Sequence, residues 1–206
     1  MIHHSAWSTD HYGVMTLISL ARYASDVRHL CSGAVGSVPV DVLIEGPRAS
    51  RLARYTLARL AHALPPMLVL HDDALLTAGR VLDDLLPGVA SDEIPFLVVS
   101  IGRRIDPCSS DAGGIVLADP RDPCAVLPSV MVVARGAHIV GMATAIAAPK
   151  RPDSLIAATV SCGRAAMSTV LARHVLTLGP TSAEPLLRMS DASGLAICAD
   201  GSLIPC

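Results

Sequence analysis

The segment Val-Met-Val-Val-Ala-Arg-Gly-Ala-His-Ile-Val-Gly, residues 130–141, decides the fold class of this chain. It contains two short apolar runs, Val130–Ala134 and His138–Gly141, on either side of Arg135-Gly136, and such runs are typical of β-strands. Similar runs occur elsewhere in the chain, at Val38–Ile44, Met67–Leu70, Phe96–Ser100, Gly114–Ala118 and Ser154–Val160. Because most of these strands crowd into the middle of the chain, the pattern argues against a doubly wound parallel sheet.

Apolar residues at helical spacing predict the helices on either side of these strands. The clearest is Arg48–Leu64, which has one apolar stripe and ends at Pro65-Pro66. The other predicted helices are Met15–Leu30, Asp73–Leu86, Arg164–Leu178 and Thr181–Met189. The chain closes with a predicted hairpin, Gly194–Ala199 and Ser202–Pro205, around Asp200-Gly201, a pair that accepts positive φ.

This order of elements predicts an α+β fold, a helix-on-sheet sandwich in a single domain. We assign residues 38–206 to that domain. Residues 1–37 form an N-terminal extension that contains one helix, Met15–Leu30, followed by a Gly/Ser connector, Cys31–Ser37.

The composition excludes several classes of protein. Of 206 residues, 51% are hydrophobic and only 17% are charged, which is too apolar for a disordered chain. One Trp, one Phe and three Tyr offer too few flat faces for stacking of single-stranded nucleic acid. Sixteen Lys and Arg stand against eighteen Asp and Glu, so the chain has no excess positive charge for nucleic acid or anionic lipid. The apolar excess favours a homo-oligomer or a protein partner.

No stretch of about 18 uninterrupted apolar residues predicts a membrane span. Residues 13–30 come nearest but contain Arg22, Asp26 and Arg28, and they lack the basic start and cleavage site of a secretory signal. We therefore expect a cytoplasmic protein. The six cysteines are irregularly spaced and form no Cys-x-x-Cys pair, so we expect free thiols and neither a disulfide framework nor a zinc site.

The general nucleotide-binding, hydrolase and zinc motifs are absent, which leaves groups of polar residues as candidates. Asp73, Thr77, Arg80 and Asp84 share one side of a predicted helix, as a polar site or as ordinary helix-start and surface charges. A second set lies on another predicted helix and consists of Thr169, Arg173 and Thr177, which form either a site or a polar edge.

Two further candidates lie at the ends of predicted strands. Arg103 and Arg104 follow Ser100-Ile-Gly102 at a strand exit, where functional sites often form. His138 precedes an apolar strand, where a lone histidine is usually a core or edge residue without a catalytic role.

Five blocks in order resemble the ApbE family, the FAD:protein FMN transferases, in their short actinobacterial form. Residues 40–46 and the helix after them resemble the family's opening strand and helix, and Asp73-Ala-Leu-Leu-Thr-Ala-Gly-Arg-Val-Leu-Asp-Asp84 resembles D-L-G-A-T-A-K-A-x-A-A-D. Phe96–Arg103, continued by Gly113–Pro123, resembles L-V-x-x-G-G-D and G-W-x-V-x-x-x-D-P-R-D-P. Val132–Thr144 resembles V-A-x-R-x-G-x-x-A-T-S-S-T. Ile156–Gly179 and Gly194–Leu203 resemble the closing strand, the A-D-A-x-A-T-A helix and the terminal hairpin.

The resemblance implies a fold built for moving FMN from FAD to a Thr or Ser hydroxyl with magnesium, but the residues for that chemistry are replaced. The family's Lys falls on Gly79, and the second Gly and the Asp of G-G-D fall on Arg103 and Arg104. Only Thr144 remains of T-S-S-T, and the His-x-x-Asp-Pro loop is missing. The metal-binding Asp and Thr fall on Thr169 and Arg173, and a guanidinium cannot ligate magnesium.

The leading hypothesis is therefore a catalytically degenerate ApbE-like protein that acts as a binding or partner module, with no bound cofactor or metal expected. The predicted remnants of the cofactor site are Thr77, Gly102, Arg103, Thr144, Thr169 and Arg173. The resemblance implies that Arg103, Arg104 and Arg173 come together, either to bind an anion or as residues of a decayed pocket that only reach water. An alternative is a repurposed cyclase- or isomerase-type enzyme for an anionic small molecule, with Asp73, Asp84 or His138 as acid–base residues. A second alternative is residual magnesium-dependent flavin transfer.

Overall fold

The computed structural model describes residues 19–22, 28–46, 48–66, 71–90, 94–105, 127–148, 151 and 154–206. Within these residues, nine antiparallel strands form one sheet in which each strand pairs with the next one along the chain. The strands are β1 (Ser19–Arg22), β2 (Arg28–Val35), β3 (Val38–Glu45), β4 (Phe96–Ile101), β5 (Ser129–Arg135), β6 (His138–Ile146), β7 (Leu155–Cys162), β8 (Ser193–Cys198) and β9 (Leu203–Pro205).

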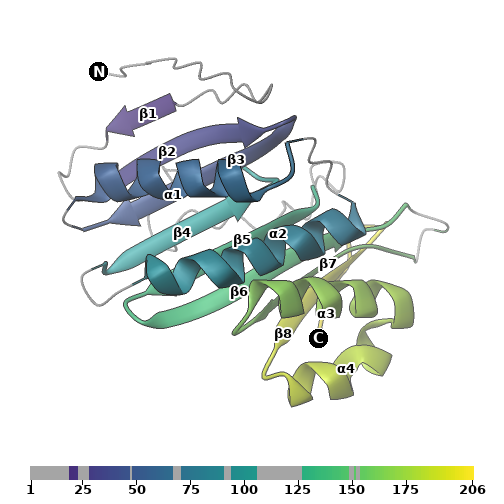
Figure 1. Ribbon diagram of the computed structural model, residues 1–206. Helices are drawn as coiled ribbons and strands as arrows, with labels where there is room; N and C mark the ends of the chain where they lie inside the picture. Colours follow the sequence, from purple (N-terminus) through teal and green to yellow (C-terminus); the bar gives the residue numbers. More distant parts are fainter. Residues whose placement is uncertain are drawn as a thin grey trace.

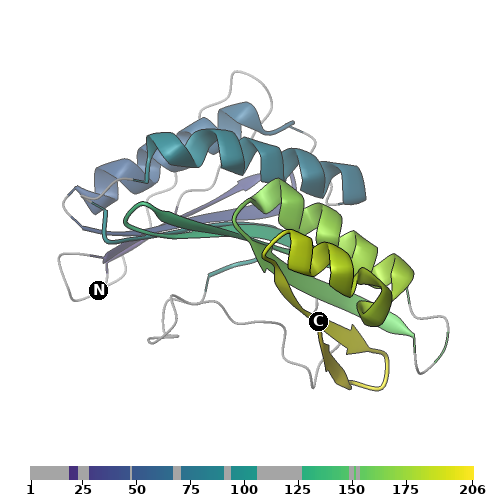
Figure 2. The ribbon, with the colours of Figure 1, turned by 90° about the horizontal axis from the view of Figure 1, so that it is seen from below.

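The described helices form a layer on one side of this sheet (Figures 1 and 2). They are α1 (Ala49–Ala63), α2 (Asp72–Leu85), α3 (Ala165–Leu178) and α4 (Pro180–Met189), with a short 3₁₀ turn, η1 (Leu86–Gly88), after α2. Helix α1 packs on β2 and β3, α2 on β5, and α3 on β6 and β7. Helix α4 packs beside α3 and reaches β8.

Strand alternation sorts side chains between the two faces of the sheet. On β3, Val40, Val42 and Ile44 join the cluster that includes the buried residues of α1 and α2, so they lie on the helix side. Leu43, between them, belongs to a separate cluster with Val98 of β4. Asp41 shares the face of Leu43 and therefore lies on the side of the sheet opposite the helices.

The structure confirms the predicted α+β class, a sheet covered by helices. The helices predicted at Arg48–Leu64, Asp73–Leu86, Arg164–Leu178 and Thr181–Met189 occur as α1, α2, α3 and α4, within about two residues at each end. The closing hairpin is present as β8 and β9. The predicted strands Met67–Leu70 and Gly114–Ala118 lie outside the described residues.

Two predictions near the N-terminus are wrong where the structure describes them. The helix predicted at Met15–Leu30 is replaced by strand at Ser19–Arg22 and again from Arg28, and the Gly/Ser connector at Cys31–Ser37 is mostly strand β2. Strand β2 pairs along its whole length with β3, and this pairing overrides the weak strand propensity of its small residues. The turn between the two strands falls at Gly36, whose φ of 59° suits glycine.

Four described cysteines, Cys31, Cys162, Cys198 and Cys206, are free thiols, as predicted for them, and the first three are buried. Burial raises the pKa of Cys31 to about 11, so this thiol stays protonated at neutral pH and is a poor nucleophile. Among the described helices, none is long and apolar enough to cross a membrane.

Candidate functional site

Helices α2 and α3 approach each other closely because glycine lines their contact. A Cβ atom on Gly79 of α2 would lie 2.9 Å from the Cα atom of Ala166 on α3. Beneath them, a Cβ atom on Gly141 of β6 would lie 2.2 Å from the backbone nitrogen of Ala165. The first turn of α3 is therefore held between a glycine on α2 and a glycine on the sheet.

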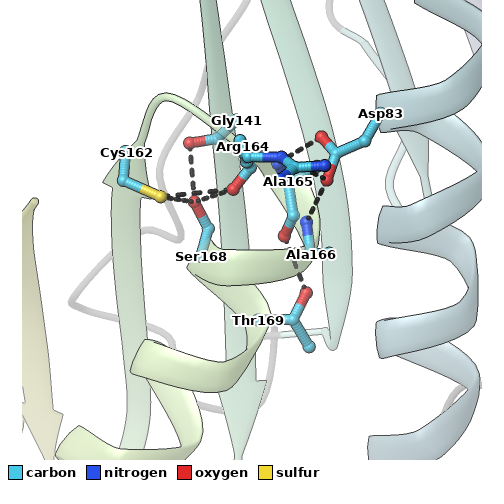
Figure 3. A network of polar contacts seen from close by, with 8 residues as sticks. All are labelled: Asp83, Gly141, Cys162, Arg164, Ala165, Ala166, Ser168 and Thr169. Carbon is cyan, nitrogen blue, oxygen red and sulfur yellow. Dashed lines mark hydrogen bonds and ion pairs between the residues drawn. The ribbon is translucent and has the colours of Figure 1, made fainter. Parts of the chain in front are cut away.

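The N-terminus of α3 is capped by a carboxylate from α2 (Figure 3). Arg164, at the N-cap position, makes no side-chain capping bond. Instead, the backbone N–H groups of Ala165 and Ala166 donate to the two carboxylate oxygens of Asp83, at 2.7 and 3.1 Å. The Nε atom of Arg164 lies 3.8 Å from the same carboxylate. Asp83 thus fills the place where a helix N-terminus could otherwise hold an external anion.

On its other side, the first turn of α3 is tied to the sheet by a buried serine. The Ser168 hydroxyl lies 2.9 Å from the Gly141 carbonyl oxygen and 3.1 Å from the Arg164 carbonyl oxygen. The Cys162 Sγ atom lies 3.2 Å from the Ser168 hydroxyl (Figure 3). Ser168 is fully buried, so this hydroxyl is part of the packing of α3 and is not accessible to a substrate.

The outer surface between the two helices is hollowed into what we call the α2–α3 groove. Two adjoining hollows of about 230 and 360 Å³ share Leu76 and Val170. Their other lining residues are Arg80, Asp83 and Asp84 on α2, Ala166, Met167, Thr169, Arg173, His174, Thr177 and Leu178 on α3, and Arg164 before α3. Of the candidate site residues predicted from the sequence, the ones that line this groove are Arg80, Asp84, Thr169, Arg173 and Thr177.

Most polar groups at the groove already interact within the chain. Arg173 Nη1 lies 3.9 Å from the carboxylate of Asp73, which is 88% exposed. The hydroxyls of Thr169 and Thr177 each donate to the carbonyl oxygen four residues earlier, as does the hydroxyl of Thr77, a predicted site residue on α2 that does not line the groove. Because each hydroxyl hydrogen is already donated to a carbonyl oxygen of its own helix, these groups are not available as hydrogen-bond donors to a ligand.

A histidine that the sequence reasoning did not select also lines the groove. His174 Nδ1 lies 3.0 Å from the Val170 carbonyl oxygen. A carbonyl oxygen can only accept, so this contact requires the hydrogen on Nδ1 and leaves Nε2 as the acceptor in the neutral ring.

The three arginines expected to converge do not do so. Arg104 Nη1 lies 2.5 Å from the buried carboxylate of Asp41 and also donates to the Gly33 carbonyl oxygen. Asp41 lies on the face opposite the helices, whereas Arg173 belongs to α3. The prediction of one site containing Arg104 and Arg173 is therefore wrong. The prediction failed because the backbone after β4 turns over the face of the sheet opposite the helices, where Arg104 meets Asp41.

Arg103 lies at the exit from β4. Burial lowers the pKa of its guanidinium, and its carbonyl oxygen accepts a hydrogen bond from Ser100. Gly102, just before it, has a φ of 95° and donates from its N–H to the Pro39 carbonyl oxygen at 2.9 Å. These contacts fasten the strand exit to β3.

Other predicted site residues lie apart from one another. The Thr144 hydroxyl on β6 pairs with the Thr159 hydroxyl on β7, 2.9 Å away. His138 is exposed, and it lies opposite Arg135 in the strand register at the turn between β5 and β6. Asp73 and Asp84 are separated by about 16 Å along α2, at a rise of about 1.5 Å per residue. No single acid–base centre is formed by Asp73, Asp84 and His138.

The residues present do not suit magnesium or a flavin pyrophosphate at the positions that the family resemblance gives to them. Thr169 is buried and donates to Ala165, while Arg173 contributes a cation. Gly79 stands where the resemblance gives a lysine, and α3 leaves no room there even for a Cβ atom. Among the residues that the structure describes, no three His, Cys, Asp or Glu side chains gather as metal ligands.

Asp83 and Met167 also line the groove, and the sequence reasoning selected neither of them as a site residue. The sequence signal for Asp83 was indirect: Arg164 is a poor N-cap, so the first N–H groups of that helix need acceptors from elsewhere, but nothing in the sequence says which residue supplies them. Met167 is exposed on the outer side of α3 and resembles an ordinary core methionine in the sequence. No family model and no curated protein matches the chain.

Proposed function

We propose that this chain is an ApbE-like scaffold that has no FMN-transfer activity and binds a partner through the α2–α3 groove. The family likeness is supported by the order of elements from β3 onward. Each block that resembles a family strand forms a strand, and each block that resembles a family helix forms a helix, wherever the structure describes it. The missing activity is supported by the replaced residues, because Thr169, Arg173 and Gly79 supply neither metal ligands nor a lysine.

One observation carries the binding function. Most polar groups of the groove already interact within the chain, whereas apolar side chains remain open to solvent between them. Met167 is 44% and Leu178 is 49% exposed, and Leu76 and Val170 beside them are half-buried. An apolar strip bordered by charges is a common docking surface for another protein's helices.

A repurposed enzyme is less well supported by the same geometry. That hypothesis needs arginines gathered around an acid–base pair, but Arg104 turns to the opposite face of the sheet. The predicted acid–base residues Asp73 and Asp84 lie at different ends of α2. A groove whose polar groups mostly interact within the chain suits binding better than proton transfer.

The proposed loss of activity is tested by incubating the whole chain with FAD, magnesium and a peptide that carries a threonine acceptor. We expect no covalent flavin on the peptide, by in-gel flavin fluorescence and by intact mass. An active FMN transferase, run in parallel on the same peptide, controls for the acceptor. A flavinylated peptide in the sample with this chain would refute the proposal and support residual flavin transfer.

A further inference from the structure

The outer surface of α2 and α3 carries a charge pattern that complements itself. Asp73 and Asp84 are exposed on α2, with Arg80 between them, whereas Arg164 and Arg173 border the groove on the side of α3. The two helices run in opposite directions. One hollow therefore contains Asp84 and Arg164, and Asp73 lies beside Arg173 near the other. One wall is mainly acidic and the other is basic.

We propose that the α2–α3 groove is the interface of a symmetric dimer, so that the partner is a second copy of this chain. This inference rests on the proposed binding function and names the occupant of the same groove. A twofold axis that lies in the interface, along the groove, places α2 of one copy on α3 of the other. Each contact then occurs twice, as in any isologous interface.

Charge selects this orientation of the axis over the alternative. With the axis along the groove, Asp84 faces Arg164 of the partner subunit, and Asp73 faces Arg173 of the partner subunit. With the axis across the helices, Arg164 would instead face the partner's Arg173, and like charges at an interface are unfavourable. Asp73 and Arg164 are 88% and 75% exposed, so these side chains can reach a second copy without unfolding.

The centre of the proposed interface is apolar. Met167 lies between the charged ends, with Leu76 and Val170 beside it. Two layers of antiparallel helices laid face to face bury such residues as the core of a four-helix arrangement. The dimer therefore removes from water the apolar strip that a single copy leaves exposed.

Sedimentation velocity on the whole chain tests the proposal. We expect the wild-type chain to sediment as a dimer, and we expect Met167→Glu to raise the dimer dissociation constant at least about ten-fold, because it places a charge in the interface core. Met189→Glu is the matched control, since Met189 is 85% exposed on α4 and does not line the groove. It should remain as dimeric as the wild type, and circular dichroism should show all three chains folded.

A second experiment tests whether the twofold axis runs along the groove. Asp84→Lys and Arg164→Glu should each weaken self-association, because each creates two like-charge contacts across the interface. An equimolar mixture of the two variants should recover dimers, because both contacts in the mixed dimer then join opposite charges.

The proposal is overturned if the wild-type chain is a monomer, if Met167→Glu dimerises as tightly as the wild type, or if mixing the charge variants restores nothing. None of these results affects the flavin-transfer assay, and a flavinylated peptide would not affect the sedimentation result. The dimer and the lost activity can therefore fail separately.

Discussion

Gly141→Ala is expected to lower the free energy of unfolding by about 3 kcal/mol, the upper end of the usual cost of overpacking a core. The added Cβ atom would lie 2.2 Å from the Ala165 nitrogen and 2.4 Å from the Arg164 carbonyl carbon. Both are backbone atoms of the start of α3, so neither can rotate away. The whole first turn of α3 must rise from the sheet, which also strains the hydrogen bond between Ser168 and the Gly141 carbonyl.

Urea unfolding of the variant and the wild type measures this effect, and the chain provides a matched control. Gly163→Ala makes the same chemical change two residues before α3, where an added Cβ atom meets nothing within 4 Å. We expect this control to change stability by less than about 0.5 kcal/mol, as surface substitutions usually do. If the two variants have the same free energy of unfolding, the close packing of α3 on β6 at Gly141 is contradicted.

Asp83→Ala is expected to lower the free energy of unfolding by about 2 kcal/mol. The substitution leaves the N–H groups of Ala165 and Ala166 without their acceptors, and losing a helix cap typically costs about 1 to 2 kcal/mol. It also removes the negative charge that favours the positive end of the α3 dipole. Asp83→Asn should cost less than Asp83→Ala, because an amide oxygen can still accept one of the two hydrogen bonds.

The neighbouring Asp84→Ala controls for loss of an acidic residue from the same helix, since Asp84 is exposed. Unfolding is best compared in the Met167→Glu background, so that the proposed dimer adds nothing to either value. Hydrogen exchange should locate the effect, with faster exchange at Ala165 and Ala166 in Asp83→Ala alone. Equal stability of the Asp83 and Asp84 variants would contradict the capping role of Asp83.

The regular elements were predictable because each one repeats a pattern along its own sequence. Helices such as Arg48–Leu64 show a long apolar stripe, and strands such as Phe96–Ser100 show a compact apolar run. Strand β2 was not predictable in this way. Its Ser32-Gly33-Ala34 has the composition of a connector and becomes strand only through pairing with β3.

The candidate site was predictable only in part, because it depends on how elements meet. Spacing along α2 favoured Asp84, because Asp84 falls on the same side of the helix as Asp73, Thr77 and Arg80. In the structure, however, the residue that caps α3 is Asp83. That role depends on the approach of α3 at Gly79, which no local pattern contains. In the same way, sequence does not specify the face to which the chain turns after β4, so Arg104 and Arg173 were wrongly expected together.

We propose that the α2–α3 groove binds protein and no longer holds flavin or metal. Titration of FAD into the whole chain, with and without magnesium, tests this proposal most directly, with flavin fluorescence as the readout. We predict no saturable binding in either titration, because Arg173 and the buried Thr169 stand at the positions that the family resemblance gives to metal ligands. Saturable FAD binding that requires magnesium would show that the chain has kept the flavin and metal site.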